Sequence, residues 1–131
     1  MAPLLRIFIV CFCVGNWLAC TEAPDRLGTL DLATWRADRG SCSGQRAELR
    51  EAFNQEQGRL IGKSANDIGQ LLGRPDVHQL GGRNQKVYVY FMEKGIHCND
   101  ITQPSKALKA ILRFNAVGLL TEVSIQTQPL E

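Results

Sequence analysis

The sequence contains no apolar run long enough to cross a bilayer. Its longest apolar stretch, IFIVCFCVGNWLA, covers the 13 residues 7–19, whereas a helix that spans roughly 30 Å of hydrocarbon needs about 20 residues. The stretch follows a single positive charge at Arg6 and gives way to the polar TEAPDR, which is the order of a secretory signal peptide. We therefore predict that residues 1–19 are a signal peptide; a permanent transmembrane helix is the alternative.

An excess of charge of either sign is also missing. Fifteen Lys and Arg side chains stand against thirteen Asp and Glu side chains, which gives a formal net charge of +2 at pH 7. Removal of residues 1–19 would lower this to +1, because that segment holds Arg6 and no acid. Nucleic-acid binding usually needs a clear basic excess, so none is predicted. With 44% hydrophobic residues over 131 positions, the chain suits one small folded domain.

Recognisable catalytic and cofactor motifs are lacking as well. The segment GRLIGKS has three residues between Gly58 and Gly62, whereas a phosphate-binding P-loop needs four, so no nucleotide site is predicted. The two histidines are His78, which we expect to be a solvated strand residue, and His97. The pair of His97 and Cys98 has no second pair to complete a four-ligand zinc site, and neighbouring side chains on a strand or loop point apart. We predict no catalytic residue, no metal site and no cofactor.

The five cysteines divide into groups by their positions. Cys11 and Cys13 would leave with the signal peptide. The segment LAC at residues 18–20 resembles the lipobox of bacterial lipoproteins. This resemblance implies cleavage before Cys20, diacylglycerol on its thiol and a membrane anchor. In bacteria with two membranes, Thr21 at the next position implies export to the outer membrane, facing the periplasm.

The remaining cysteines, Cys42 and Cys98, form an even pair. A disulfide is the expected fate of such a pair in an oxidising compartment. It would close a loop of 57 residues, counted from 42 to 98, and chain entropy gives about 4 kcal/mol as an upper figure for its stabilisation. Two free structural thiols or a reactive thiol are the alternatives. A reactive pair would make the protein a thiol-based redox protein or enzyme.

Three helical patterns follow a polar segment at residues 20–29, which we expect to be a lipidated tether. The first pattern, residues 31–40, starts at the candidate N-cap Asp31. The second, residues 45–57, ends at Gly58, which is placed for a left-handed cap. Its apolar face consists of Leu49, Ala52 and Phe53.

The third helical pattern, SANDIGQLLGRP at residues 64–75, is the clearest. Ser64 is a candidate N-cap, Asp67 lies at the capping-box position and Gly73 ends the apolar periodicity. Gly69 in the middle costs about 1 kcal/mol relative to Ala. Either a partner element approaches closely there, or the helix is less than ideal.

The period of the apolar residues then changes to two. VHQL at 77–80 and KVYVYF at 86–91 are predicted strands, and ALKAILRFN at 107–115 and LLTEVSIQT at 119–127 form a predicted hairpin. Helices first and a strand meander after them predict an α+β fold. We expect two to three N-terminal helices packed on one face of a three- to four-stranded antiparallel meander. This domain would comprise residues 30–131.

Strand alternation predicts which side chains face the helices. On the strand at 86–91 we expect Val87, Val89 and Phe91 to point inward, so that Tyr88 and Tyr90 point outward. On the next two strands the expected inner residues are Leu108, Ala110, Leu112, Phe114, Val123 and Ile125. Because Tyr and Arg are enriched at binding hot spots, the outer face is a candidate partner surface, formed by Tyr88, Tyr90, Ile111 and Arg113. A half-solvated sheet face with ordinary cross-strand pairs is the alternative.

Two segments carry a family resemblance. GKSANDIGQLLGRP at residues 62–75 resembles the helix and its flanking residues in BamE (SmpA/OmlA-like) outer-membrane lipoproteins. LRFNAVGLLTEVSI at residues 112–125 resembles the strand-turn-strand hairpin of the same domain, which other bacterial envelope lipoproteins share. The matched positions are Gly62, Ser64, Ile68, Leu72, Gly73, Pro75, Phe114, Asn115, Gly118, Leu120 and Thr121.

The resemblance covers about residues 60–126 and implies a BamE-like domain. We therefore expect a lipid-anchored cell-envelope protein that acts as a non-enzymatic interaction or assembly module. The expected partners are the membrane, through lipid on Cys20, and another envelope protein. No nucleic acid and no nucleotide is expected to bind.

Overall fold

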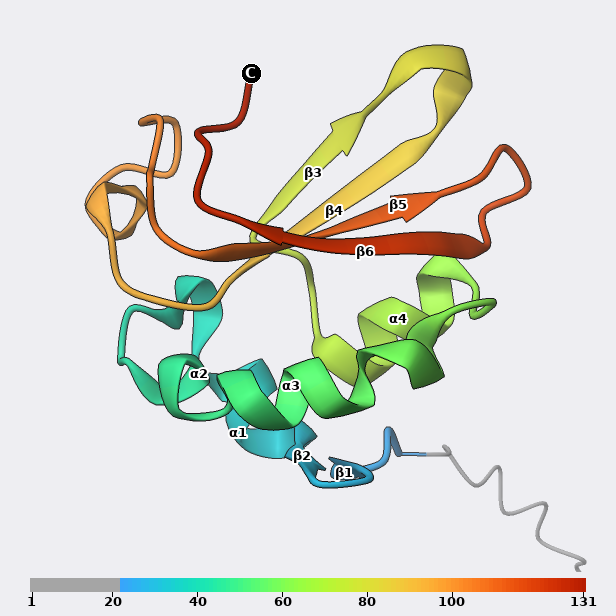
Figure 1. The fold of residues 1–131 in the computed structure, drawn as a ribbon, viewed down its shortest axis with the longest axis horizontal. Coiled ribbons are helices and arrows are strands. Elements are labelled where there is room, and N and C mark those ends of the chain that lie inside the picture. The colour runs from blue at the N-terminus through green and yellow to red at the C-terminus, as the bar shows by residue number, and fades with distance from the viewer. Residues whose placement is uncertain (1–21) are drawn as a thin grey trace, which may run out of the picture.

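The computed structural model describes residues 22–131. They form an α+β fold in which a layer of helices covers one face of a four-stranded antiparallel sheet (Figure 1). The predicted fold class is confirmed. The predicted signal peptide at residues 1–19 and the predicted lipidation site Cys20 lie outside the described residues.

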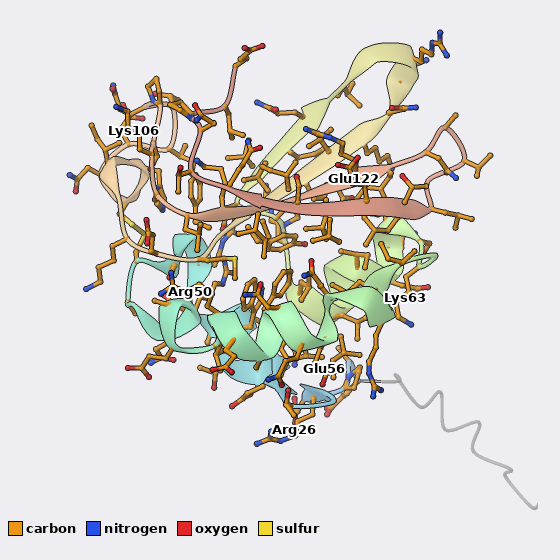
Figure 2. The ribbon with its side chains drawn as sticks, viewed as in Figure 1. Arg26, Arg50, Glu56, Lys63, Lys106 and Glu122 are labelled. Atoms are coloured by element: carbon orange, nitrogen blue, oxygen red, sulfur yellow. A yellow bond between two sulfur atoms is a disulfide. The ribbon has the colours of Figure 1, made fainter. Side chains whose placement is uncertain are left out.

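The helical layer is built from the first half of the described chain. Its α-helices are α1 (Leu32–Ala37), α2 (Gln45–Glu48), α3 (Arg50–Glu56) and α4 (Ala65–Leu72). The 3-10 turns η1 (Arg39–Ser41) and η2 (Gln57–Leu60) lie between these helices. Two further 3-10 turns, η3 (Gly82–Asn84) and η4 (Ile96–Cys98), lie between strands of the sheet. The core lies between this layer and the sheet, while charged side chains such as Arg26, Arg50 and Lys106 lie at the periphery (Figure 2).

Helix α4 matches its sequence signals. The Ser64 side chain accepts a hydrogen bond from the backbone N–H of Asp67 at 3.1 Å, and Gly73 ends the helix with a φ of 81°. The buried face consists of Ala65, Ile68, Leu71 and Leu72. A Cβ atom placed on Gly69 would meet nothing within 4 Å. Of the two explanations for this glycine, the less-than-ideal helix is therefore the one that applies.

The helix predicted at residues 45–57 is interrupted. Its two parts, α2 and α3, meet at Leu49, whose N–H points to the carbonyls of both Gln45 and Arg46. Gly58 does not form the expected left-handed cap, because the chain continues as a 3-10 turn that brings Leu60 into the core. The glycine with positive φ comes later, at Gly62.

The tether predicted at residues 20–29 is partly folded onto the domain. Strands β1 (Arg26–Leu27) and β2 (Leu30–Asp31) form a short antiparallel pair. Leu27 packs against the core, and the Asp25 carbonyl accepts a hydrogen bond from the N–H of Leu32 at 2.8 Å. The Pro24 carbonyl also accepts a hydrogen bond from Arg36 at 2.9 Å, so the chain is attached to the domain from Pro24 onward.

The main sheet has the strand order β3-β4-β5-β6, with neighbours antiparallel throughout. The strands are β3 (Val77–Leu80), β4 (Lys86–Phe91), β5 (Lys109–Phe114) and β6 (Leu120–Gln126). The meander predicted from the sequence is confirmed. On β5 and β6 the inner face is also as predicted, with Leu112 and Phe114 in the core and Val123 and Ile125 packed against it.

The predicted orientation of β4 was wrong. Tyr90 is fully buried in the core, and its hydroxyl donates a hydrogen bond to the Gly73 carbonyl at 2.8 Å. Tyr88 lies on the same side, with its ring edge-to-face on Phe114 at 4.8 Å between centroids. The register pairs Tyr90 with Ala110, a residue too small to fill the space under the helices that the tyrosine occupies.

Candidate functional site

The predicted partner surface is split between the two faces of the sheet. Tyr88 and Tyr90 face the helices, whereas Ile111 and Arg113 lie on the opposite face, which we name the outer sheet face. Ile111 is only 2% exposed, and Arg113 alone of the four is exposed. The outer sheet face carries Val77, Gln79, Val87, Val89, Phe91, Lys109, Ile111 and Arg113.

The outer sheet face is covered in part by the chain itself. Lys109 is completely buried there, and its Nζ donates hydrogen bonds to the carbonyls of Ser105 at 2.9 Å and Gln128 at 2.8 Å. Burial lowers the pKa of this ammonium group. Lys109 therefore joins two segments to the sheet: the loop that follows η4 and the C-terminal residues 127–131. We name the second the C-terminal segment.

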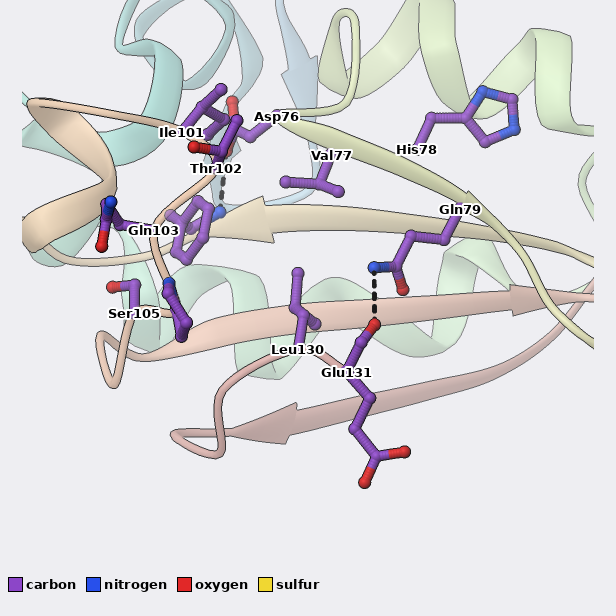
Figure 3. Close-up of a pocket in the computed structure, with 12 residues that line it drawn as sticks. Asp76, Val77, His78, Gln79, Ile101, Thr102, Gln103, Ser105, Leu130 and Glu131 are labelled. Atoms are coloured by element: carbon purple, nitrogen blue, oxygen red, sulfur yellow. Dashed lines mark hydrogen bonds between the residues drawn. The ribbon is translucent and has the colours of Figure 1, made fainter.

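A groove of about 500 Å³ lies between β3, residues 101–105 and the C-terminal segment (Figure 3). Val77 and Phe91 supply apolar surface, and Ile101 at its edge is half exposed. The Gln79 amide donates to the Glu131 carbonyl at 3.4 Å across it. A smaller hollow of about 300 Å³ lies on the other side of Leu130 and includes Ile111 and Arg113.

A buried ion pair joins the helical layer to the sheet. Arg46 and Asp76 are 2.7 Å apart, and their side chains are 1% and 2% exposed. The Arg46 Nε also donates to the Trp35 carbonyl at 2.9 Å. Asp76 accepts further bonds from the backbone N–H groups of Gly40 at 2.9 Å and Phe91 at 2.8 Å. This arrangement fixes the position of Gly40, and no sequence motif indicated it.

Asp38 holds the start of α2 in place beside this pair. Its carboxylate accepts hydrogen bonds from the N–H groups of Ser43 at 2.8 Å and Arg46 at 3.0 Å. Burial opposes ionisation of Asp38, but the hydrogen bonds from Arg46 and Ser43 outweigh it and lower the pKa of the carboxyl group.

The predicted disulfide is confirmed. Cys42, which directly follows η1, is bonded to Cys98, at the end of η4, across 56 positions of sequence, with the Cα atoms 5.7 Å apart. It therefore ties the start of the helical layer to the segment after β4. Cys42 is exposed.

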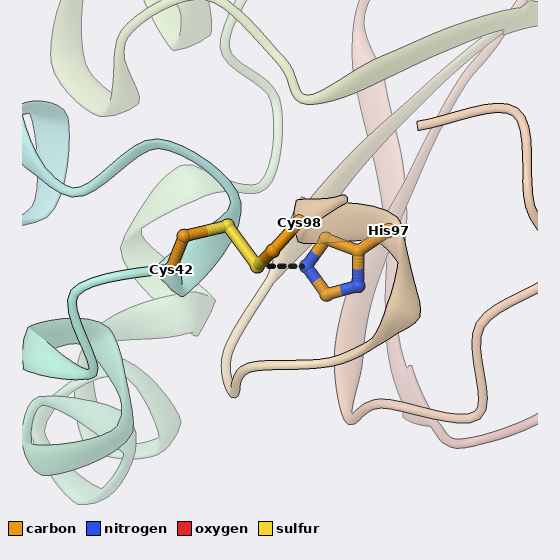
Figure 4. Close-up of side chains that lie close together, drawn as sticks. All are labelled: Cys42, His97 and Cys98. Atoms are coloured by element: carbon orange, nitrogen blue, oxygen red, sulfur yellow. Dashed lines mark hydrogen bonds between the residues drawn. A yellow bond between two sulfur atoms is a disulfide. The ribbon is translucent and has the colours of Figure 1, made fainter. Parts of the chain in front are cut away.

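The prediction that His97 points away from Cys98 was wrong. The two residues lie in a 3-10 turn, where successive side chains do not alternate as in a strand. As a result, His97 Nε2 lies 3.6 Å from Cys98 Sγ (Figure 4). The imidazole is buried and stacks on Phe91 with 3.5 Å between ring centroids and 8° between planes.

The hydrogen bonds of His97 define its tautomer. Nε2 lies 2.7 Å from the Gly40 carbonyl, which can only accept, so Nε2 carries a proton. Nδ1 lies 2.9 Å from Ser105 Oγ. Because that oxygen already accepts from the N–H of Ala107 at 3.2 Å, the Ser105 hydroxyl is free to donate to Nδ1. The neutral Nε2–H form satisfies every partner.

Cys42, His97 and Cys98 also place three potential metal-ligand atoms within 4.8 Å of one another. Metal ligation needs thiolate sulfur and an unprotonated imidazole nitrogen. In this structure the sulfurs are bonded to each other, and Nε2 donates to Gly40. The arrangement of these three residues therefore fits a disulfide with a neighbouring imidazole better than it fits a bound metal ion.

Within residues 22–131, no helix combines the length and the apolar character needed to cross a membrane. The chain was compared with protein-family models, curated proteins and solved structures, and no match was found. The resemblance to BamE-like lipoproteins and the lipidation of Cys20 therefore stay predictions.

Proposed function

We propose that this protein is a lipid-anchored module of the bacterial cell envelope that binds an extended segment of another envelope protein without catalysing a reaction. The binding place is the groove between β3, residues 101–105 and the C-terminal segment. The observation that carries the proposal is that this face already holds a segment of polypeptide, residues 127–131, by hydrogen bonds to its main-chain oxygens. Main-chain carbonyls of Gln128 and Glu131 accept hydrogen bonds from Lys109 and Gln79 of the sheet.

The groove has the chemistry for such a segment. Val77, Phe91 and Ile101 offer apolar contacts, and the hydroxyl and amide groups of Thr102 and Gln103 line the same space. An extended peptide exposes main-chain carbonyls and N–H groups that such side chains can bind, and it exposes one apolar side chain in every two residues to the sheet. The proposed occupant is therefore an extended segment with alternating apolar residues.

The disulfide supports an envelope location. Bonds of this kind persist in the periplasm and outside the cell, where thiols are not kept reduced. Since Cys42 and Cys98 are bonded to each other, neither is available to Cys20, which leaves that thiol for lipid. Four positions separate Cys20 from Pro24, where the chain joins the domain, and at roughly 3.3 Å per residue they reach no more than about 13 Å. The module would sit close to the outer membrane, on its periplasmic side.

Lipidation is tested by labelling. Wild-type protein grown with labelled palmitate should incorporate the label, and Cys20→Ser should not, while its precursor stays uncleaved. Cys42→Ser serves as the matched control, because it also removes a cysteine but should keep the label. Equal labelling of the wild type and Cys20→Ser would rule out the anchor.

Segment binding is tested by site-specific photo-crosslinking in intact cells. A photoreactive residue at Gln103, which is exposed in the groove, should give a defined adduct, whereas the same residue at Arg50, exposed on α3, should not. A second substitution, Ile101→Glu, should abolish the adduct by placing a charge at the apolar edge. Adducts of equal yield at both positions, or an adduct that Ile101→Glu leaves unchanged, would contradict the proposal.

A further inference from the structure

The disulfide has a hydrogen-bond donor beside one of its two sulfurs. Among residues 22–131, the side-chain N–H that faces the bridge lies beside Cys98, whose Sγ is 3.6 Å from His97 Nε2. The ring of His97 is held by its stacking on Phe91 and by Ser105. Its proton is on Nε2, the nitrogen that faces the sulfur. The two ends of the bridge are therefore chemically different.

This difference matters for thiol–disulfide exchange. In that reaction a thiolate attacks one sulfur and the other leaves as a thiolate, and a better-stabilised leaving thiolate departs faster. A thiolate on Cys98 would lie 3.6 Å from His97 Nε2, whose proton now bonds to the Gly40 carbonyl at 2.7 Å and would be shared with the anionic sulfur. Both cysteines reach the surface, so this difference in the leaving thiolate, and not exposure, should direct the attack to Cys42.

The surroundings favour the approach of a thiolate. A hollow of about 380 Å³ borders the disulfide, and Arg39 and Arg74 line it together with Cys42 and Cys98. Arg74 is exposed. Positive charges around a cleft raise the local concentration of an anionic reactant.

We propose that Cys42–Cys98 is an exchangeable disulfide whose reaction partner is an external dithiol. A thiolate of the dithiol bonds to Cys42 Sγ, the bond to Cys98 breaks, and its electron pair stays on Cys98, where the His97 Nε2–H stabilises it. The second thiol of the dithiol then attacks the mixed disulfide and releases Cys42. The dithiol leaves as a disulfide, and the two protons that it loses protonate the two cysteines. This reaction is independent of the lipid anchor and of the groove.

The site of attack is tested by trapping the mixed disulfide. The native, oxidised full chain is mixed with glutathione, quenched with N-ethylmaleimide and cut with trypsin, which places Cys42 in the peptide 40–46 and Cys98 in the peptide 95–106. In doubly modified molecules, glutathione should lie on the peptide 40–46 and maleimide on the peptide 95–106. The reverse distribution, or equal amounts of the two, would overturn the proposal.

The part played by His97 is tested by the rate of reduction with dithiothreitol under native conditions. His97→Phe keeps a ring to stack on Phe91 and removes the donor, so reduction should become about tenfold slower. A purely structural role predicts the opposite, because a looser fold exposes the bond. His78→Phe, which changes the exposed histidine on β3, is the matched control and should leave the rate unchanged.

A second variant covers the case in which His97→Phe does not fold. His97→Gln retains a side-chain N–H, and its reduction rate should lie between those of the wild type and the phenylalanine variant. Thermal melting of each oxidised protein establishes that the rates refer to folded molecules. A rate equal to or above that of the wild type in a folded variant without the donor would overturn the proposal.

Discussion

The guanidinium of Arg46 lies 2.7 Å from the carboxylate of Asp76, and neither side chain is more than 2% exposed. Arg46 belongs to α2, and Asp76 immediately precedes β3. The pair therefore crosses between the helical layer and the sheet at the point where Gly40 and Phe91 also bond to Asp76. The pair therefore also holds in place Gly40, which lies two residues before Cys42 of the disulfide.

Removing one partner of this pair should be strongly destabilising. Asp76→Ala leaves a buried cation on Arg46 and two unpaired N–H groups, so the free energy of unfolding should fall by about 3 kcal/mol or more. Urea denaturation at pH 7 with the disulfide intact measures it. Asp25→Ala, which breaks the exposed pair with Arg36, should cost less than about 1 kcal/mol. Equal costs for the two variants would contradict this account.

The disulfide should contribute substantially to stability. Cys42→Ser/Cys98→Ser removes a link between residues 56 positions apart, and chain entropy sets an upper figure of about 4 kcal/mol for the loss. The melting temperature should fall by several degrees, and the far-UV circular dichroism should stay the same. Reduced wild-type protein is the control and should melt near the double variant. Melting of the variant at the wild-type temperature would show that the bond does not stabilise the fold.

Substitution by alanine should change the stability in opposite directions at Gly69, inside α4, and at Gly73, which follows it. Gly69→Ala meets open space and should raise the free energy of unfolding by roughly 0.5–1 kcal/mol. Gly73→Ala should lower it, because φ is 81° and the new Cβ would lie 3.2 Å from Arg36 Cγ. Denaturant unfolding of both variants checks this prediction. A loss of stability in Gly69→Ala would mean that the helix has a partner on that side.

Tyr90 should matter for stability and for its dependence on pH. Tyr90→Phe loses the hydrogen bond to Gly73 and should cost about 1 kcal/mol. Burial raises the pKa of the Tyr90 phenol above its ordinary value near 10. Above that pH the unfolded chain loses this proton and the folded chain keeps it, so stability falls as the pH rises.

The pH dependence of the free energy of unfolding distinguishes the contribution of Tyr90 from that of other groups that titrate at alkaline pH. Unfolding free energies of the wild type and Tyr90→Phe measured from pH 8 to pH 11 should converge above pH 10. Only the wild type has a buried phenol that stays protonated in the folded state and loses its proton on unfolding. Parallel curves over this range would contradict the burial of Tyr90 and restore the outward orientation that strand alternation suggested.

Local patterns in the sequence determined several elements of this protein by themselves. Helix α4 was predictable because its cap, its apolar face and its terminating glycine are all set by residues within one short segment. The strands followed from an apolar period of two, and the pairing of Cys42 with Cys98 followed from a count of the cysteines. Each of these signals depends on neighbours in the chain or on composition.

Tertiary structure alone decided which face of β4 points to the helices. Alternation separates Val89 from Tyr90 but does not say which one is inside when both sides are apolar, and both become buried here. The register that places Tyr90 beside Ala110 made that choice. The contact of His97 with Gly40 needs segments 57 positions apart to meet, and the pairing of Arg46 with Asp76 needs segments 30 positions apart to meet. Such contacts depend on how the layers pack, and periodicity within one segment carries no information about them.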